Sequence, residues 1–347
     1  MLGHALRSIH GKTVLLFPFV YLGQTITGVS SYVFTITTSA TTTGRGQNDK
    51  NNKMREAIIG AIINRRVPAV YYRVERWLSL KNAVDAFLHE LHDKKPYSRV
   101  ECIHAAGRGH NYDFSIVFAT GDDASNTDKP EENNRYNVEF KFNAAKVSDT
   151  PQFVSPMKPS QYLSASYEEY FYDNYMSTIA TAAATAGATA TVLPDRAEWL
   201  KQIHNNAPAC VSVLQDKYYA GCANSSQFTN DAGDIAFYEL CKKLSTESIR
   251  TFITEHDLHI AKLSEYLRES QHDKTYMLFQ PGATGADVVV PTITLQCVDP
   301  ADYKIVACHK NPTKSRYECE TESGKKINVL LRWKNGNGIA FPAFQIS

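Results

Sequence analysis

Two carboxylates and a lysine lie in neighbouring strand-like stretches of the sequence. Asp113 precedes the apolar part of "NYDFSIVF" (111–118), and Glu139 and Lys141 lie two residues apart in "YNVEFKFNAA" (136–145). Side chains i and i+2 of a strand project from the same face, so Glu139 and Lys141 are expected to lie together. If the two strands pair, Asp113 can join them. The sequence then predicts a compact charged site.

The expected chemistry of this site is metal-assisted hydrolysis. Two carboxylates at close range repel each other unless a cation lies between them. Mg²⁺ is the expected cation, with Mn²⁺ as a substitute, because it binds a few hard oxygen ligands and keeps several waters. Asp113 and Glu139 would be ligands, with the backbone carbonyl of Phe140 as a further donor. A water acidified by the metal and held near Lys141 would attack a phosphodiester in line. The alternative is an ordinary ion pair between Glu139 and Lys141, which contributes little to stability.

The surrounding elements must position these residues. Residues 76–95 ("RWLSLKNAVDAFLHELHDKK") have apolar side chains every three or four positions, which predicts an amphipathic helix. Strands are expected at 98–106, 111–118 and 136–145, followed by a helix at 164–186. Residues 195–270 are largely helical in pattern, and strand-like runs dominate from Tyr276 onward. This order predicts an α/β fold with a helical insertion and a C-terminal β-rich part.

Residues 78–186 resemble the PD-(D/E)xK nuclease superfamily, which has the restriction-endonuclease-like fold. The resemblance is carried by the order helix, strand, strand with Asp113, strand with Glu139-x-Lys141, helix. It implies a mixed central sheet flanked by helices, with Asp113 and Glu139 as metal ligands and Lys141 as the lysine that assists the water. Tyr112 stands where the family usually has proline, which is a departure from its pattern.

The resemblance also implies an activity. Many members take a further glutamate from the helix before the first strand, which indicates Glu90, with Glu75 as a competitor. The implied function is Mg²⁺-dependent endonucleolytic hydrolysis of DNA, and the sequence does not discriminate between DNA and RNA. Enzymes of this fold that cut both strands often act as homodimers. One alternative is a catalytically inactive nucleic-acid-binding module on the same fold. Another is a structural or host-interaction protein in which the motif is coincidental.

Candidate nucleic-acid contacts flank the expected site. The glycine-rich "AAGRGHN" (105–111) carries Arg108 and His110 and would let a phosphate backbone approach closely. His110 could act as a base near a metal, although a lone histidine beside a strand is more often structural. Gln152 follows the third strand, where some family members place a glutamine that positions DNA; a helix-cap or turn role is the alternative.

The C-terminal region is locally basic. Residues 303–347 contain eight Lys or Arg and three Glu, a local net charge of +5. Arg332, Trp333 and Lys334 adjoin an Asn-Gly turn, which predicts a hairpin with a basic, aromatic tip that contacts phosphate. The alternative is a hairpin that closes the sheet, with Trp333 in the core.

The domain prediction has two parts. Residues 1–53 are interpreted as an N-terminal extension or leader plus a linker at 44–53, and residues 54–347 as the nuclease domain with a helical insertion at about 195–270. The apolar run "TVLLFPFVYLG" (13–23) has the length of a signal-peptide core, and a pair of N-terminal strands is the alternative. The run is too short and too interrupted by proline and glycine to predict a membrane span.

The composition limits the cellular setting. The formal net charge of +1 indicates no general affinity for nucleic acid, so any such affinity must come from local patches. Seven scattered cysteines show no zinc-binding spacing and favour reduced thiols over a disulfide framework. We therefore expect an intracellular protein of the cytoplasm or nucleus, with no membrane partner.

Overall fold

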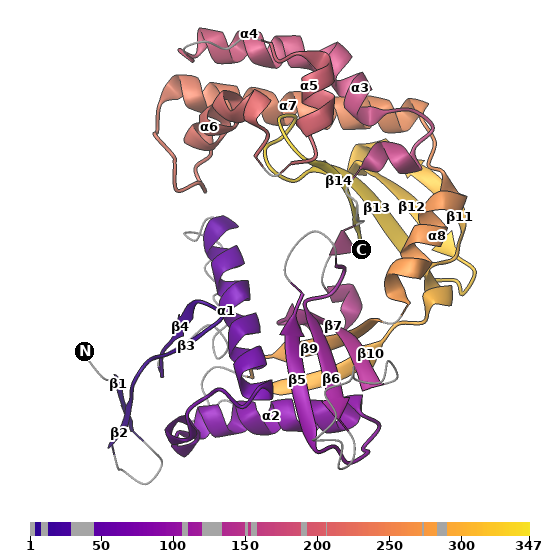
Figure 1. Cartoon of the computed structure of the whole chain (residues 1–347). Coiled ribbons are helices and arrows are strands. Elements are labelled where there is room, and N and C mark those ends of the chain that lie inside the picture. Colours follow the sequence, from indigo (N-terminus) through magenta and orange to yellow (C-terminus); the bar gives the residue numbers. More distant parts are fainter. Residues whose placement is uncertain are drawn as a thin grey trace. The chain divides into compact units, whose positions relative to one another are not determined.

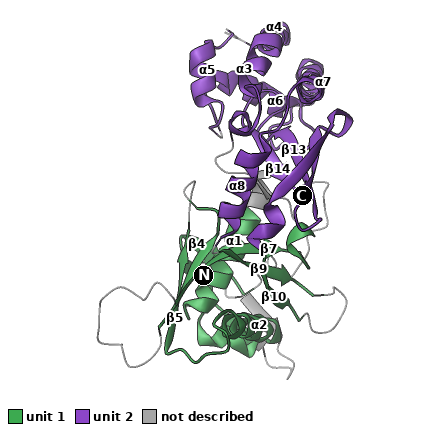
Figure 2. Cartoon of the chain, turned by 90° about the vertical axis from the view of Figure 1, so that its right-hand side faces the viewer, with its two compact units in different colours: residues 1–150, 273–298 green, residues 151–272, 299–347 purple. Residues whose placement is uncertain are grey.

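The chain forms two compact units, each with its own sheet. The computed structural model describes residues 4–7, 13–28, 45–105, 110–119, 134–149, 152–153, 158–188, 193–205, 207–272, 274–282 and 290–347. Unit 1 contains Met1–Thr150 and Asp273–Val298, and unit 2 contains Pro151–His272 and Asp299–Ser347 (Figure 2). The sequence predicted one domain over residues 54–347 with a helical insertion. The chain instead divides into two units, because the strands after residue 304 build a second sheet. The fold class is mixed α/β, as predicted.

The sheet of unit 1 is mixed, in the strand order β10-β9-β7-β6-β5 (Figure 1). Strands β5, β6 and β7 pair antiparallel in that order. β7 and β9 run parallel, and β9 and β10 are antiparallel. The strands are β5 (Arg99–His104), β6 (Phe114–Ala119), β7 (Arg135–Phe142), β9 (Lys274–Gln280) and β10 (Thr292–Cys297). The strands predicted at 98–106, 111–118 and 136–145 are confirmed.

Two helices, α1 (Arg45–Ile63) and α2 (Glu75–Leu91), pack with one face of this sheet in a shared apolar core. Val138 and Phe140 of β7 point into that core and are buried. Because side chains alternate along a strand, Glu139 and Lys141 project from the opposite face. The sheet therefore has an apolar face and a face that can carry charge.

The N-terminal segment contains strands. They are β1 (His4–Arg7), β2 (Thr13–Leu16), β3 (Phe19–Tyr21) and β4 (Gln24–Ile26). Leu16 and Ile26 are fully buried in the core of unit 1, so the apolar run there contributes to packing. The stretch 44–53, predicted as a linker, lies largely in α1, which begins at Arg45. Among the described helices none is long and apolar enough to cross a membrane.

Unit 2 combines helices with an antiparallel sheet in the order β11-β12-β13-β14-β8. Its strands are β11 (Ile305–Asn311), β12 (Arg316–Thr321), β13 (Lys326–Trp333), β14 (Pro342–Ile346) and β8 (Gln152–Phe153). Its helices are α3 (Tyr167–Phe171), a π-helical turn (Tyr172–Met176), α4 (Ser177–Thr185), α5 (Arg196–Gln202), α6 (Ser212–Gly221), α7 (Ala232–Glu255) and α8 (Ile260–Gln271).

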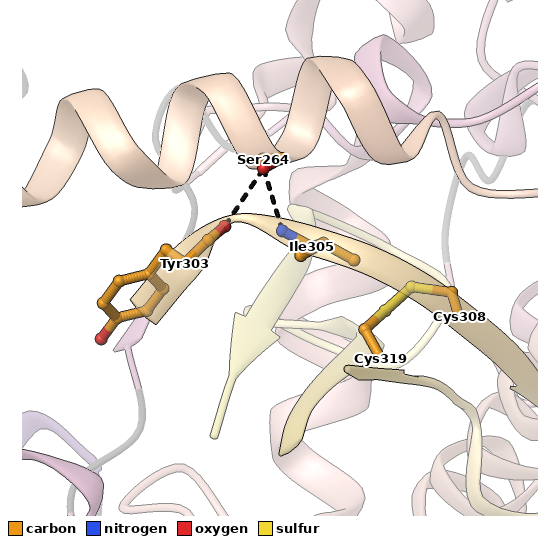
Figure 3. The surroundings of a disulfide bond; sticks show 5 residues. All are labelled: Ser264, Tyr303, Ile305, Cys308 and Cys319. Atoms are coloured by element: carbon orange, nitrogen blue, oxygen red, sulfur yellow. Dashed lines mark hydrogen bonds between the residues drawn. A yellow bond between two sulfur atoms is a disulfide. The ribbon is translucent and has the colours of Figure 1, made fainter. Parts of the chain in front are cut away.

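A disulfide between Cys308 and Cys319 links β11 to β12 (Figure 3). The register places these two residues opposite each other, which the sequence spacing did not reveal, so the expectation of reduced thiols is wrong for this pair. Ser264 of α8 fixes the start of β11. Its hydroxyl donates to the Tyr303 carbonyl (3.2 Å) and accepts from the Ile305 N–H (3.0 Å).

Candidate active site

Glu139 and Lys141 form an ion pair on the face of β7 opposite to Val138 and Phe140. The Lys141 ammonium contacts Glu139 Oε1. The two side chains are only 16% and 15% exposed, so this pair is far less solvated than a surface ion pair. Two residues of one strand supply both charges because their spacing of two puts them on one face.

Asp113 lies beside this pair. Phe114 is opposite Val138 in the antiparallel register, so one position further Asp113 lies opposite Glu139. The Phe140 N–H donates to Asp113 Oδ2 (2.8 Å), and the Asp113 N–H donates to the Val138 carbonyl (3.0 Å). Burial raises the pKa of Asp113, and the Glu139 charge adds to that effect. The structure therefore brings the three predicted residues together.

A second lysine, which the sequence did not indicate, completes the neighbourhood of Glu139. Lys274 is the first residue of β9, and its ammonium contacts Glu139 Oε2. Burial acts to raise the pKa of Glu139, but the charges of Lys141 and Lys274 outweigh it, and the pKa is lowered. Glu139 is therefore held ionised between two cations. Only the parallel pairing of β7 with β9 brings Lys274 here, since 133 positions separate it from Lys141 in the chain.

A third carboxylate approaches Asp113 from α1. Burial raises the pKa of Glu56 to about 7, and the negative charge of Asp113 contributes, while Lys53 opposes it. An effect of one charge on the other requires that the two carboxylates lie near each other. The charge of Asp113 is thus felt at Glu56, which belongs to α1 rather than to the sheet.

The position of Glu56 follows from how α1 is held against β5. Asn64 makes two hydrogen bonds to the edge of this strand: its Nδ2 donates to the Cys102 carbonyl (2.8 Å), and its Oδ1 accepts from the Cys102 N–H (2.7 Å). One turn earlier, a Cβ at Gly60 would lie 2.1 Å from His104 Nε2, so glycine is required for the close approach. Glu56 precedes Gly60 by four residues, which places it on the same side of the helix.

Glu90, the predicted helix glutamate, lies on the exposed side of α2. The helix glutamate whose pKa responds to the charge of Asp113 is Glu56, on α1. The spacing of Glu56, Gly60 and Asn64 at four-residue intervals was the signal available in the sequence.

The other residues predicted near the site are dispersed. His110 is exposed, and its ring lies 5.1 Å from that of Tyr112. Gln152 is part of β8 in unit 2, where its backbone is paired with Ile346. Arg108 lies outside the described residues.

The predicted basic hairpin tip is not assembled as expected. β13 and β14 do form a hairpin, but Trp333 is 3% exposed, and its indole N–H donates to the Tyr167 hydroxyl (2.9 Å). Arg332 donates to Gln345 Oε1 (2.6 Å), and the Lys334 ammonium lies 5.3 Å from the centre of the Phe341 ring. Trp333 therefore belongs to the aromatic core of unit 2, which was the alternative, and the prediction of an exposed aromatic tip is wrong.

The basic character of the C-terminal region is also reduced by pairing. Four of its cations lie in ion pairs with acids. The pairs are Lys304 with Glu322, Lys310 with Asp257, Arg316 with Glu318, and Lys325 with Asp302. Exposed pairs of this kind leave little net potential for attracting a phosphate backbone.

The chemistry of the donor set suits Mg²⁺. Asp113 and Glu56 have raised pKa values because burial and a neighbouring negative charge disfavour their ionised forms, and a divalent cation would relieve both effects. Hard oxygen ligands are also those that Mg²⁺ binds. As the side chains stand, however, no group of three or more His, Cys, Asp or Glu within the described parts of the chain is gathered closely enough to hold a metal. To bind a metal, Glu139 would have to give up its contact with Lys141 or Lys274.

Comparisons with known proteins add no constraint on the site. No family model matches the chain, and a search of curated proteins finds no match. Function therefore has to be argued from the site itself.

Proposed function

We propose that this chain is a Mg²⁺-dependent endonuclease that hydrolyses DNA phosphodiester bonds, on a restriction-endonuclease-like sheet. The observation that carries the proposal is the convergence of Asp113, Glu139 and Lys141 from two neighbouring strands. The order antiparallel β5, β6 and β7, with β9 parallel to β7, supports the same fold assignment.

The residues have separable roles in such a reaction. Asp113 and Glu139 would be the principal ligands of the metal, with the Phe140 carbonyl and Glu56 as further oxygen donors. When bound, Mg²⁺ would acidify water and neutralise charge on the phosphate. Lys141 would orient the attacking water and offset negative charge that builds up on the phosphate oxygens.

A second candidate is a catalytically inactive nucleic-acid-binding module. The observation that favours it is the double engagement of Glu139 by lysines, which leaves neither carboxylate oxygen of this residue free of an ammonium. In that case the lysines replace the metal permanently and the charged cluster is structural. This module would bind DNA equally well with and without Mg²⁺.

Plasmid cleavage separates the two candidates. We expect Mg²⁺-dependent relaxation or linearisation by the wild type, and a loss of at least about a hundredfold in Glu139→Gln and Asp113→Asn. Glu318→Gln is the matched control, because Glu318 also pairs with a cation two residues away on a strand. Circular dichroism would verify the fold of each variant. Equal cleavage by the wild type and Glu139→Gln would exclude the nuclease assignment, and DNA binding without any cleavage would favour the inactive module.

A further inference from the structure

The second lysine at Glu139 is unusual in its position. Its side chain is 6% exposed, while that of Glu139 is 16% exposed. Burying an ammonium costs free energy unless a carboxylate compensates for it. Lys274 therefore depends on Glu139 for its buried position, and its ammonium in turn stabilises the Glu139 carboxylate. The ammonium also lies 5.3 Å from the centre of the Tyr276 ring, whose π face adds to the attraction.

The two lysines occupy different oxygens of one carboxylate. Lys141 contacts Oε1, and Lys274 contacts Oε2. Lys141 is already accounted for by its place two residues after Glu139, where it can reach water and phosphate. Lys274 has no such role in the proposed reaction, and it comes from a separate strand.

We propose that Lys274 is a built-in counter-cation that occupies one oxygen of the Glu139 carboxylate and thereby sets the affinity of the site for a divalent metal. The inference rests on the proposed function. A metal ligated by Glu139 and Asp113 must displace the Lys274 ammonium, and the cost of that displacement is subtracted from the metal-binding free energy. Lys274 is thus a positioning residue: its contact holds the Glu139 carboxylate in place while no metal is bound.

Direct metal binding tests this role without relying on catalysis. The probe is Mn²⁺ alone, and free Mn²⁺ is measured by electron paramagnetic resonance during titration of the full-length chain. Lys274→Gln removes the charge and keeps a hydrogen-bond donor for Glu139. We expect it to bind Mn²⁺ about tenfold more tightly than the wild type, which corresponds to about 1.4 kcal/mol. Lys274→Arg keeps the charge and should retain the wild-type affinity.

Two further variants make the result specific. Lys217→Gln breaks another poorly exposed lysine–carboxylate pair, with Asp234 (2.6 Å), and should leave Mn²⁺ binding unchanged. Glu139→Gln should abolish the site in either background. If Lys274→Gln does not fold, Lys274→Met is the second charge-removing variant, and the Mn²⁺-dependent shift of its thermal unfolding is the second measurement.

The outcomes are distinguishable. Unchanged or weaker Mn²⁺ binding by Lys274→Gln, in a chain whose wild type cleaves plasmid DNA with Mg²⁺, overturns the role of Lys274 and leaves the nuclease proposal intact. If neither the wild type nor the charge-removing variants bind Mn²⁺, and the wild type does not cleave, both proposals are overturned together.

Discussion

A cation and a glutamate two residues apart on one strand form an ion pair in both β7 and β12, in very different surroundings. In β7, Glu139 and Lys141 are poorly exposed, and neighbouring strands bring Asp113 and Lys274 to the pair. In β12, Arg316 Nε donates to Glu318 Oε1 (2.9 Å), and these side chains are 27% and 40% exposed.

The difference lies in what each glutamate meets across the sheet. Glu318 is opposite His309 and Asn328, and it accepts a further hydrogen bond from Asn311 (2.9 Å), so its neighbours leave it an ordinary ion pair. Glu139 instead meets a second carboxylate and a second ammonium. The spacing within one strand is thus necessary for a site of this kind, and the neighbouring strands decide whether the site exists.

Removing the cation of each pair should give the largest contrast. We expect Lys141→Met to lower Mg²⁺-dependent plasmid cleavage by about 10²–10⁴-fold, because the lysine orients water and offsets charge at the phosphate. Arg316→Met should stay within about threefold of the wild type, because Arg316 has no part in the proposed site. A comparable loss in both variants would show that the two pairs are equivalent and that the β7 pair is not catalytic.

Removing the glutamate should lower the free energy of unfolding more for the β7 pair than for the β12 pair. Glu139→Ala leaves two poorly exposed lysines without their carboxylate and should cost about 3–5 kcal/mol of unfolding free energy. Glu318→Ala should cost less than about 1 kcal/mol, since the pair it breaks is partly solvated. Urea denaturation followed by circular dichroism gives both values. Similar losses would mean that burial does not distinguish the two pairs.

The disulfide beside Glu318 should stabilise its sheet by a different means. The double variant Cys308→Ser, Cys319→Ser removes a cross-link that closes a short loop, and we expect a loss of about 2–3 kcal/mol in the stability of unit 2. Thermal unfolding with and without a thiol reductant provides the measurement. The wild type should fall to the level of the variant when reduced, while the variant itself should not respond to the reductant.

The pH dependence of stability should report the raised pKa of Glu56 on α1. Its folded-state pKa of about 7 lies above the ordinary value near 4.5, so the folded state binds the proton more tightly and loses stability as pH rises from about 4.5 to 7. Without divalent metal, Glu56→Gln should therefore be more stable than the wild type above pH 7, by about 3 kcal/mol.

That advantage should vanish below pH 4.5, where Glu56 is protonated in both states. Glu90→Gln is the control, because Glu90 is exposed, and it should follow the wild type across the whole range. A pH-independent difference between Glu56→Gln and the wild type would contradict the raised pKa of Glu56.

Local periodicity predicted most of the elements that form the site. The apolar spacing of α2 and the alternation of β5, β6 and β7 were sufficient, since helices and strands with one buried face have strong periods. The strand β12 has a weaker signal in the sequence, because "YECETESGKK" is polar and turn-like in composition. Its alternate residues Tyr317 and Cys319 are nevertheless buried. One apolar residue in two is a weak signal when the intervening residues are acids.

What the sequence determined by itself is the local part of the site: Glu139 and Lys141 share a face because a strand has a period of two, and Phe140 between them points into the core. The tertiary structure alone decided the rest. Lys274 reaches Glu139 through a parallel pairing of distant segments. Glu56 is influenced by the charge of Asp113 from a helix, α1, that Gly60 and Asn64 hold against β5. The same applies to Trp333, whose place in an aromatic core depends on Tyr167 far away in the chain. Such contacts depend on packing between segments, and no local period encodes them.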